Sequence, residues 1–261
     1  MELSKKVVVV TGAAGGIGLA TANACAAAGA TVVRVDVTPM PECQVVDVSD
    51  LTAMQGLAER VARDHGGADV VVNNAGVTVI GRFEDHTDAD WDRVMGVNFR
   101  GVLNGCRAFL PQMVARKRGW FVNVSSLFGI VGVPGQTAYC ASKFAVRGLS
   151  EALHEELRGT GIGVTVVHPG GVRTGIIDNA AVRADPAMIS PLSDFFARRT
   201  VAPERVADAI VGAIRNERHR LLVCPETRVL DGLRRLAPSS GNRLAVWVME
   251  RTMGMGGLRS R

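Results

Sequence analysis

Short apolar runs, rich in β-branched residues, alternate along the chain with longer segments in which apolar residues recur at helical spacing. The runs predict strands, because valine, isoleucine and threonine favour extended backbone. The predicted strands cover residues 7–11, 31–37, 44–47, 68–73, 120–125, 163–168 and 220–223. The predicted helices cover residues 16–28, 51–64, 88–116, 139–158 and 203–215, and the third is expected to be stepped around Asn98.

Most of these strands are apolar along their whole length. A strand of this kind is buried on both faces, and helices between consecutive strands provide the cover. The pattern therefore predicts an α/β fold, a doubly wound parallel sheet in a single domain. We assign residues 1–225 to this catalytic domain and expect the irregular stretch 175–200 to be a substrate loop over the carboxyl edge of the sheet. Residues 226–261 are expected to form a C-terminal helical extension.

Composition narrows the class of protein without identifying it. Apolar residues make up 47% of the 261-residue chain and charged residues 21%, which is ordinary for a globular domain. The five cysteines lack the spacing of a metal site, so we expect a reducing compartment, no disulfide framework and no metal. We find neither a secretory signal nor an apolar stretch of about 18 residues. A cytoplasmic location is therefore expected.

The net charge of +5 is unevenly distributed. Residues 218–261 contain nine arginines and three acidic residues, and the rest of the chain is near neutral. Apolar residues such as Leu244 and Trp247 lie among these arginines, so one hypothesis is that the basic extension makes weak contact with an anionic membrane surface. The other is that it is solvated or covers a neighbouring subunit. Beyond this charge the sequence has no nucleic-acid-binding motif, so no nucleic-acid partner is expected.

A glycine-rich turn joins the first predicted strand to the first helix, in the sequence Thr-Gly-Ala-Ala-Gly-Gly-Ile-Gly. A pyrophosphate needs close approach of the backbone and free N–H groups at the start of a helix. Gly12 would allow the sharp turn, Gly16 the close approach, and Gly18 the tight packing of helix on strand. Ile17 lies within the same turn. The turn predicts a dinucleotide site, although glycine-rich turns without a ligand also occur.

Tyr139 and Lys143 are four residues apart on a predicted helix, so both side chains point into the same space. Free tyrosine has a pKa of about 10, and a phenol that acts as a base near neutral pH needs a pKa roughly three units lower. A neighbouring ammonium and an oxidised nicotinamide would favour the phenolate. Tyr139 is also the only tyrosine in the chain.

These motifs, in this order, resemble those of the short-chain dehydrogenase/reductase family. The glycine turn has its T-G-x-x-x-G-x-G pattern, and Tyr139 and Lys143 form its Y-x-x-x-K pair. The resemblance extends from about residue 5 to residue 223. It implies a Rossmann-type sheet of seven mainly parallel strands, in the order 3-2-1-4-5-6-7. It also implies a homodimer or homotetramer, paired through the helices at 88–116 and 139–158.

The resemblance assigns roles to further residues. Ser126, 13 residues before Tyr139, would orient the substrate oxygen, and Asn98 would hold a water that links Lys143 to solvent. The remaining assignments concern the cofactor: Asp47 at the adenine, Asn73 at the adenosine ribose, Val172 and Thr174 at the nicotinamide carboxamide, and Tyr139 and Lys143 beside the nicotinamide ribose. A purely structural role for Asn73 is equally compatible with its sequence context.

Asp36 ends the second predicted strand, 18 residues beyond Gly18. A carboxylate there can accept hydrogen bonds from the ribose hydroxyls of NAD and would repel the 2′-phosphate of NADP. Ala14 and Val37 occupy the positions where NADP-dependent members of the family carry cations. Arg34 either pairs with Asp36 or projects away from it. We predict NAD, against the alternatives of NADP or of a merely solvated Asp36.

The predicted function is hydride transfer between NAD(H) and a secondary alcohol or ketone, with Tyr139 as the general acid and base. Apolar residues in the 175–200 loop, among them Ile176 and Ile177, favour a small-molecule substrate that is lipid- or steroid-like. The alternative is a cofactor-binding regulator or scaffold without turnover. That alternative predicts loss of Tyr139, Lys143 or Ser126, and all three are present.

Overall fold

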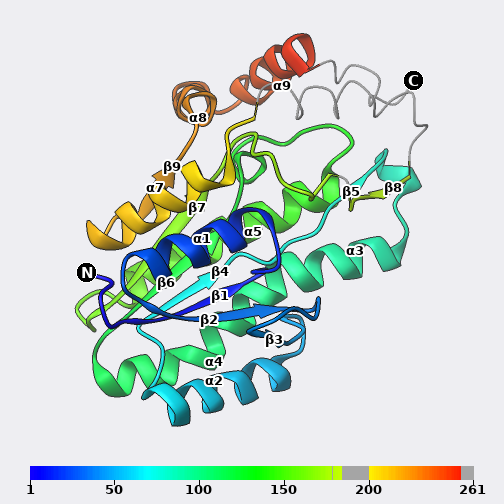
Figure 1. Ribbon diagram of the computed structural model, residues 1–261. Helices are drawn as coiled ribbons and strands as arrows, with labels where there is room; N and C mark the ends of the chain where they lie inside the picture. The colour runs from blue at the N-terminus through cyan, green and yellow to red at the C-terminus, as the bar shows by residue number, and fades with distance from the viewer. Residues whose placement is uncertain (178, 184–199, 254–261) are drawn as a thin grey trace.

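The computed structural model describes residues 1–177, 179–183 and 200–253. Its centre is a seven-stranded sheet in which every pair of neighbouring strands is parallel (Figure 1). The strands are β1 (Val7–Thr11), β2 (Thr31–Asp36), β3 (Cys43–Val45), β4 (Val70–Asn73), β6 (Gly119–Val124), β7 (Ile162–His168) and β9 (Arg220–Leu222). Their order is β3-β2-β1-β4-β6-β7-β9, which confirms the predicted fold class.

Helices cover both faces of the sheet. The helices in the described residues are α1 (Gly16–Ala27), α2 (Leu51–His65), α3 (Asp88–Met95), α4 (Gly101–Arg116), α5 (Thr137–Glu156), α7 (Pro203–Arg215), α8 (Pro225–Leu236) and α9 (Gly241–Met253). Helices α1 and α7 pack on one face, and α2, α4 and α5 contribute to the core on the other (Figure 1).

Strand β1 shows why whole runs of the sequence are apolar. Val8 and Val10 are fully buried under α1 and α7, whereas Val7 and Val9 belong to the core on the opposite face. Successive side chains of a strand point to opposite faces, so a strand with helices on both sides needs an apolar residue at every position. Removing these side chains from water is the main favourable contribution to folding of such a sheet.

The step predicted around Asn98 is a π-helical turn, Gly96–Arg100, between α3 and α4. Such turns add one residue to a helical turn and occur often at functional sites. Thr87 and Asp90 form a reciprocal capping box at the start of α3. The three segments thus form one long helical element that the sequence pattern predicted as a single helix with an interruption.

A second, two-stranded sheet was not predicted. Strand β5 (Val79–Ile80) pairs in parallel with β8 (Ala181–Val182), at the start of the predicted substrate loop. Two residues per strand are too few to give a period-two pattern in the sequence. Residue 178 and residues 184–199 of the same loop lie outside the described residues.

The C-terminal extension packs against the main domain through α9. Ala245, Val246 and Met249 are buried there, in a core cluster with residues of the loop that follows β6. The Asn242 amide holds the backbone of Gly132 in both directions, at 3.0 and 3.1 Å. The extension therefore forms part of the wall behind the carboxyl edge of the sheet.

The predictions about cysteines, metals and membrane spans concern absences. All five cysteines are free. Among the residues that the structure describes, no three potential ligands gather into a metal site. In the same residues, no helix combines the length and apolar character needed to cross a bilayer.

Candidate active site

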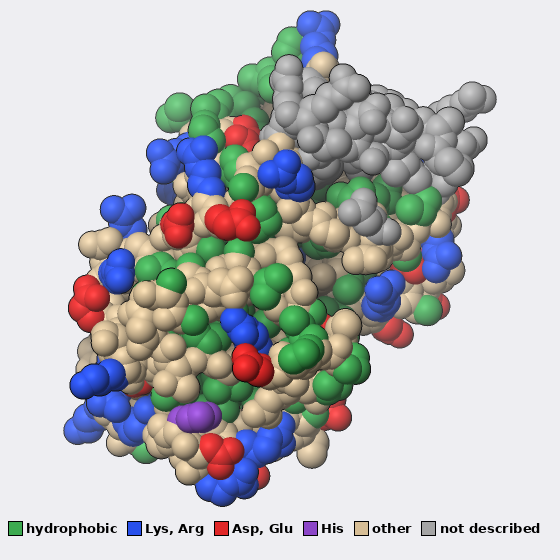
Figure 2. All heavy atoms as spheres, viewed as in Figure 1, with side chains coloured by type: hydrophobic (Ala, Val, Ile, Leu, Met, Phe, Trp, Pro, Cys, Tyr) green, Lys and Arg blue, Asp and Glu red, His purple; other side chains and the backbone are tan. Residues whose placement is uncertain are grey.

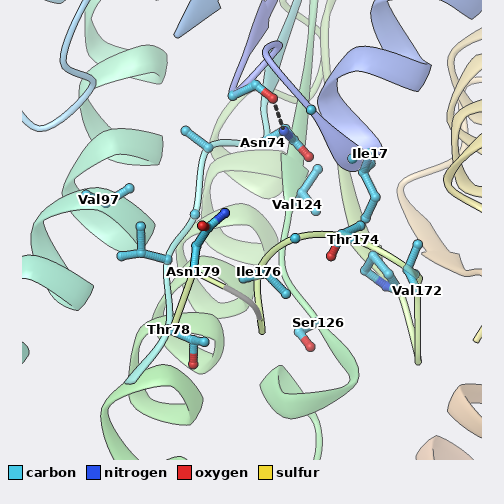
Figure 3. A pocket seen from close by; sticks show the side chains of 18 of the residues that line it. Ile17, Asn74, Thr78, Val97, Val124, Ser126, Val172, Thr174, Ile176 and Asn179 are labelled. Atoms are coloured by element: carbon cyan, nitrogen blue, oxygen red, sulfur yellow. Dashed lines mark hydrogen bonds between the residues drawn. The ribbon is translucent and has the colours of Figure 1, made fainter. Parts of the chain in front are cut away.

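A cavity of about 590 Å³ opens at the carboxyl edge of the sheet. Its lining comes from the loops after β1, β2, β3, β4, β6 and β7, together with the π-helical turn and the first turns of α5. Figure 3 shows side chains from these loops pointing toward a common space, with Ile17 and Thr174 near one end and Thr78 and Ser126 toward the other. In open α/β sheets ligands bind at this edge, so the cavity is the natural place for the predicted chemistry.

The glycine-rich turn forms one end of the cavity. Gly12 and Gly16 have φ angles of 67° and 52°, in the left-handed region that favours glycine. A Cβ on Gly18 would lie 1.9 Å from the Gly12 carbonyl oxygen, so the turn and the helix leave no room for a side chain at this position. Gly15 is the N-cap of α1 and provides no side-chain cap, so the first N–H groups of the helix remain available to an anion.

Asp36 lines the cavity next to this turn. Its carboxylate accepts hydrogen bonds from the backbone N–H groups of Ala14 and Thr38, each at 3.0 Å. Arg34 projects away, because its guanidinium donates to Asn23 at 2.8 Å and lies 3.5 Å from Glu42. Lys143 is the only Lys or Arg among the described residues that line the cavity. None of these lining residues therefore places a cation beside Asp36, where the 2′-phosphate of NADP would bind.

The structure corrects the prediction for Asn73. Its side chain is buried away from the cavity and donates to Asn123 at 2.8 Å, which supports a structural role between β4 and β6. The next residue, Asn74, lines the cavity and donates to the carbonyl oxygens of Thr11 and Gly12 at 2.9 and 3.3 Å (Figure 3). Side chains alternate in direction along a strand, so a shift of one residue separates the two roles.

Asp47 also lines the cavity, in the loop after β3. Its carboxylate accepts hydrogen bonds from the backbone N–H and the hydroxyl of Ser49, at 2.8 and 2.7 Å. These local bonds hold the side chain in place at the edge of the cavity. One carboxylate oxygen accepts both bonds, and the other, which has no hydrogen-bond partner among the described residues, can accept from a ligand.

Tyr139, Lys143 and Ser126 all line the same cavity. Tyr139 and Lys143 lie one turn apart on α5, and the Lys143 Nζ atom is 5.6 Å from the centre of the Tyr139 ring. Lys143 is buried, and its ammonium donates to the Val124 carbonyl oxygen at the end of β6, at 2.9 Å. The Ser126 hydroxyl accepts from the Phe128 backbone N–H at 3.1 Å.

Burial dominates the pKa values of this group in the protein alone. Burial raises the pKa of Tyr139 to about 12, and a hydrogen bond with Ser126 opposes the rise only in part. Burial also lowers the pKa of Lys143 to about 8. The ammonium is directed to a backbone carbonyl, and desolvation of the phenol outweighs its influence. In the protein alone the phenol is therefore held in its protonated form.

Asn98 is fully buried in the π-helical turn. Its Oδ1 atom accepts from the Val77 backbone N–H at 2.8 Å, and its amide donates to the Val77 carbonyl at 2.9 Å and to Ser142 at 3.0 Å. Both amide hydrogens are thus committed to holding the loop after β4 against α5. A Cβ built on Gly76 would lie 3.4 Å from Asn98 Oδ1 and 3.5 Å from Lys143 Nζ, so the two residues flank the same point.

The segment after β7 completes the end of the cavity that the glycine-rich turn and Asp36 line, which we call the cofactor end. Val172 and Thr174 both line the cavity, and a Cβ on Gly16 would lie 3.0 Å from the Thr174 side chain. His168 is buried at the end of β7, where its Nδ1 atom lies 2.9 Å from the Ser126 carbonyl oxygen. Burial lowers the pKa of His168 to about 4, so its ring is neutral near pH 7.

The other end of the cavity is mostly apolar and includes Phe128, Ile176 and Ile177. One polar pair interrupts it: the Thr78 hydroxyl donates to Gln136 Oε1 at 2.8 Å, and both residues are buried. Sequence reasoning missed Thr78, Phe128 and Gln136. Closeness to predicted site residues could have indicated two of them, because Gln136 precedes Tyr139 by one helical turn and Phe128 follows Ser126 by two residues.

The cavity thus joins two environments with different chemistry. One end offers an uncapped helix terminus and a carboxylate for a ribose, which suits a dinucleotide. The other end offers a phenol, an ammonium and a hydroxyl next to apolar side chains, which suits proton exchange with a small alcohol or carbonyl compound. No metal is needed for an arrangement of this kind, and hydride chemistry belongs to the dinucleotide.

Comparison with known proteins agrees with this geometry. The family model described as short chain dehydrogenase matches residues 6–184. The chain is 38% identical to the probable oxidoreductase EphD of Mycobacterium bovis over 256 residues, which cover 89% of this chain but only 43% of EphD. It is 36% identical to the 3-oxoacyl-[acyl-carrier-protein] reductase FabG of Thermotoga maritima over 228 residues, which cover 81% of this chain and 91% of FabG.

Among solved structures, a short-chain dehydrogenase/reductase from Burkholderia phymatum in complex with NAD superposes with a TM-score of 0.83. The two sequences are 30% identical, and the match covers 90% of this chain and 95% of that one. The matched sequence, the parallel sheet and the cavity at its carboxyl edge agree with one another. This chain belongs to the short-chain dehydrogenase family.

Proposed function

We propose that the protein is an NAD(H)-dependent oxidoreductase that interconverts a secondary alcohol and a ketone, with Tyr139 as the acid and base. The observation that carries the proposal is the meeting of Tyr139, Lys143 and Ser126 in one cavity whose far end contains the glycine-rich turn and Asp36. Each motif alone occurs in proteins without this activity. Their convergence on one cavity, whose volume is typical of a ligand site, favours catalysis over cofactor binding without turnover.

NAD rather than NADP follows from the surroundings of Asp36. A second anion within a few ångströms of this half-buried carboxylate would cost several kcal/mol at an effective dielectric of about 20. Arg34 is engaged elsewhere, and Val37 extends into solvent with 60% of its surface exposed. The related Burkholderia phymatum structure, which holds NAD, is consistent with this choice.

In the proposed reaction each residue has a separate role. Bound NAD(H) accepts or delivers the hydride. In the oxidation direction the Tyr139 phenolate oxygen takes the hydroxyl proton of the substrate, and in the reduction direction the phenol returns it. Ser126 donates a hydrogen bond to the substrate oxygen as charge develops on it. Lys143 orients the nicotinamide ribose, and Asn98 fixes the loop beside it.

The apolar end of the cavity supports a substrate with a hydrocarbon body next to its carbonyl. Phe128, Ile176 and Ile177 provide apolar contacts, and the Thr78–Gln136 pair offers one polar contact within them. FabG of Thermotoga maritima, by its name, reduces a 3-oxoacyl group, which has this character. We therefore infer an acyl- or steroid-like ketone or the corresponding alcohol.

Assembly and location remain proposals as well. We propose a homodimer or homotetramer paired through α4 and α5, the two helices implied by the family resemblance. A cytoplasmic location fits the five free cysteines. Because the chain spans less than half of EphD, the activity of that whole protein is not carried over.

A substrate screen tests the proposed reaction. Reduction of NAD⁺ would be followed over secondary alcohols, hydroxyacyl compounds and hydroxysteroids, with NADP⁺ in parallel and Tyr139→Phe as the control. We expect turnover with NAD⁺ and a loss of about 10²–10⁴-fold in the control. Equal turnover by Tyr139→Phe, or a clear preference for NADP⁺, would contradict the proposal. NADH binding without turnover of any substrate would favour the regulator hypothesis.

A further inference from the structure

The outward sides of α8 and α9 carry arginines and large apolar side chains together. We call this surface the arginine–apolar face. It consists of Arg228, Val229, Arg235 and Leu236 on α8, and of Arg243, Leu244, Trp247, Val248 and Arg251 on α9, all of them exposed. Both helices lie at the same end of the molecule, and hydrophobic and basic side chains appear on the surface over them (Figures 1 and 2).

Helical spacing explains why these residues share one side of each helix. On α8 the exposed positions recur at intervals of seven residues, as in Arg228 with Arg235 and Val229 with Leu236. On α9 they recur at intervals of four, as in Arg243 with Trp247 and Trp247 with Arg251. Leu236 is 88% exposed, Val229 68% and Trp247 45%, which is unusual for side chains of this size.

The acidic side chains that are described on these helices face the protein. Asp231 is buried and accepts a bidentate hydrogen-bond pair from Arg220 of β9. A Cβ on Gly170 would meet Glu226, whose carboxylate lies 3.4 Å from the Gly171 backbone N–H. These carboxylates therefore lie on the inner sides of the two helices, and the exposed arginines keep most of their positive charge.

The arginines of the face are largely uncompensated. Among the described residues Arg228, Arg243 and Arg251 form no ion pair, whereas Arg235 reaches Asp231 at 3.0 Å. The Arg251 guanidinium lies 4.2 Å from the centre of the Trp247 ring. This stacking keeps a cation and an aromatic ring together at the surface, a combination suited to the boundary between lipid headgroups and acyl chains.

We propose that the arginine–apolar face docks on an anionic lipid bilayer. With 13 residues, α9 is too short to span a bilayer, so it would lie in the plane of the headgroups. Trp247, Leu244 and Leu236 would enter the acyl boundary, and the arginines would contact lipid phosphates. This docking does not depend on the proposed reaction, because none of these residues lines the active-site cavity.

A second copy of the chain fits the same face poorly. A two-fold interface brings a patch against itself, and here it would place arginine opposite arginine without a described acidic side chain between them. A nucleic acid would satisfy the charge but leave the exposed leucines and Val229 in water. An anionic bilayer satisfies both the charge and the apolar surface, so it is the partner whose chemistry matches.

Docking would also place the bilayer close to the substrate end of the cavity. The inner face of α9, with Ala245, Val246 and Met249, packs in the same core cluster as Phe128 and Tyr139. The helix therefore has the bilayer on one side and the wall of the cavity on the other. An acyl- or steroid-like substrate would then be taken from the surface on which the protein rests.

Co-sedimentation of the full chain with vesicles tests the proposal. One set of vesicles contains phosphatidylcholine alone, and the other adds phosphatidylglycerol. We expect the protein to bind the anionic vesicles only, with binding that weakens as salt is raised. Arg243→Gln/Arg251→Gln should weaken binding about fivefold for each arginine. Trp247→Ser/Leu236→Ser should weaken it by a similar factor at unchanged charge.

The matched control is Arg63→Gln/Arg158→Gln, which removes two charges from exposed positions of α2 and of the segment after α5. It should bind as tightly as the unmodified protein, and all variants should keep their thermal midpoint. Equal sedimentation of the charge variant and the control would overturn the proposal. So would a change of oligomeric state in the charge variant, or binding to heparin that is unaffected by Trp247→Ser/Leu236→Ser.

Discussion

The two ends of the active-site cavity are built in different ways. The cofactor end comes mainly from the first 47 residues, with Gly12, Asp36 and Asp47 each at the end of a neighbouring strand. The substrate end brings together Thr78, Gln136 and Ile176 from three distant parts of the chain.

The difference affects what each end can tolerate. At the cofactor end, close backbone contacts leave no room for extra atoms, and functional groups are held by backbone hydrogen bonds. At the substrate end, apolar side chains can repack around ligands of different shape. This division holds the cofactor in one position and lets the substrate vary, and four sets of substitutions test it.

The largest effect is expected at the cofactor end, from Gly18→Ala. The new Cβ would lie 1.9 Å from the Gly12 carbonyl oxygen, so the turn cannot keep its conformation. We expect NADH binding to weaken by at least about 100-fold, which corresponds to about 2.7 kcal/mol. A fluorescence titration with NADH measures it. Gly212→Ala in α7, where a Cβ meets nothing within 4 Å, is the control and should bind normally.

The second-largest effect is expected where the cofactor end and the substrate end of the cavity meet. Ser126→Ala removes the hydroxyl proposed to contact the substrate oxygen and should lower kcat on the order of 100-fold while NADH binding is retained. Ser125→Ala is the matched neighbour: it also lines the cavity, but its hydroxyl is committed to the Lys143 carbonyl oxygen at 2.8 Å. It should cost about 1 kcal/mol of stability and less activity. Reversed effects of the two serines would show that the assignment is wrong.

A smaller effect is expected from exchanging the charge beside the adenosine ribose. Asp36→Ser/Val37→Arg removes the carboxylate and adds a cation at an exposed position. The ratio of kcat/KM for NADP⁺ to that for NAD⁺ should rise by roughly 10- to 100-fold, or about 1.4–2.7 kcal/mol. Steady-state kinetics with both cofactors measures the ratio. An unchanged ratio would mean that cofactor choice is determined elsewhere in the cavity.

The smallest effect is expected at the substrate end. Arg183, next to β8, donates two hydrogen bonds of 2.9 Å to Asp90 at the start of α3. Arg183 holds the pKa of Asp90 well below its usual range. Arg183→Gln should raise KM for the substrate a few-fold at nearly constant kcat, because it loosens the segment that carries Ile176. Arg158→Gln, at a solvent-exposed pair with Glu155, should change neither constant.

The same division explains what the sequence revealed. The strands and helices were predictable because buried strands and amphipathic helices have strong patterns in the sequence, whereas the strand order was implied by the family resemblance. Gly12, Asp36, Tyr139 and Lys143 were predictable because their spacing follows directly from strand ends and helical turns. The substrate end left little trace in the sequence, since Thr78 and Gln136 are 58 positions apart and meet only in the folded protein.

Two features of the site depend on the fold and leave no pattern in the sequence. Asn73 and Asn74 are identical in type, and only the direction of the chain at the end of β4 decides that Asn74 reaches the cavity. Lys143 and an oxidised nicotinamide were expected together to lower the pKa of Tyr139, and the burial that raises this pKa was not visible in the sequence. The phenolate must therefore be stabilised by what binds in the cavity, in addition to Lys143.

The central claim is that a bound dinucleotide makes the Tyr139 phenol acidic. Because the chain has a single tyrosine, the ¹³C resonance of its Cζ atom reports this phenol alone in a pH titration by NMR. We predict that the free protein keeps the phenol protonated throughout the alkaline range in which it stays folded, in line with a pKa of about 12. Saturating NAD⁺ should lower that pKa by several units, toward the roughly three-unit depression below 10 that catalysis requires. A Cζ resonance that titrates identically with and without NAD⁺ would contradict the account.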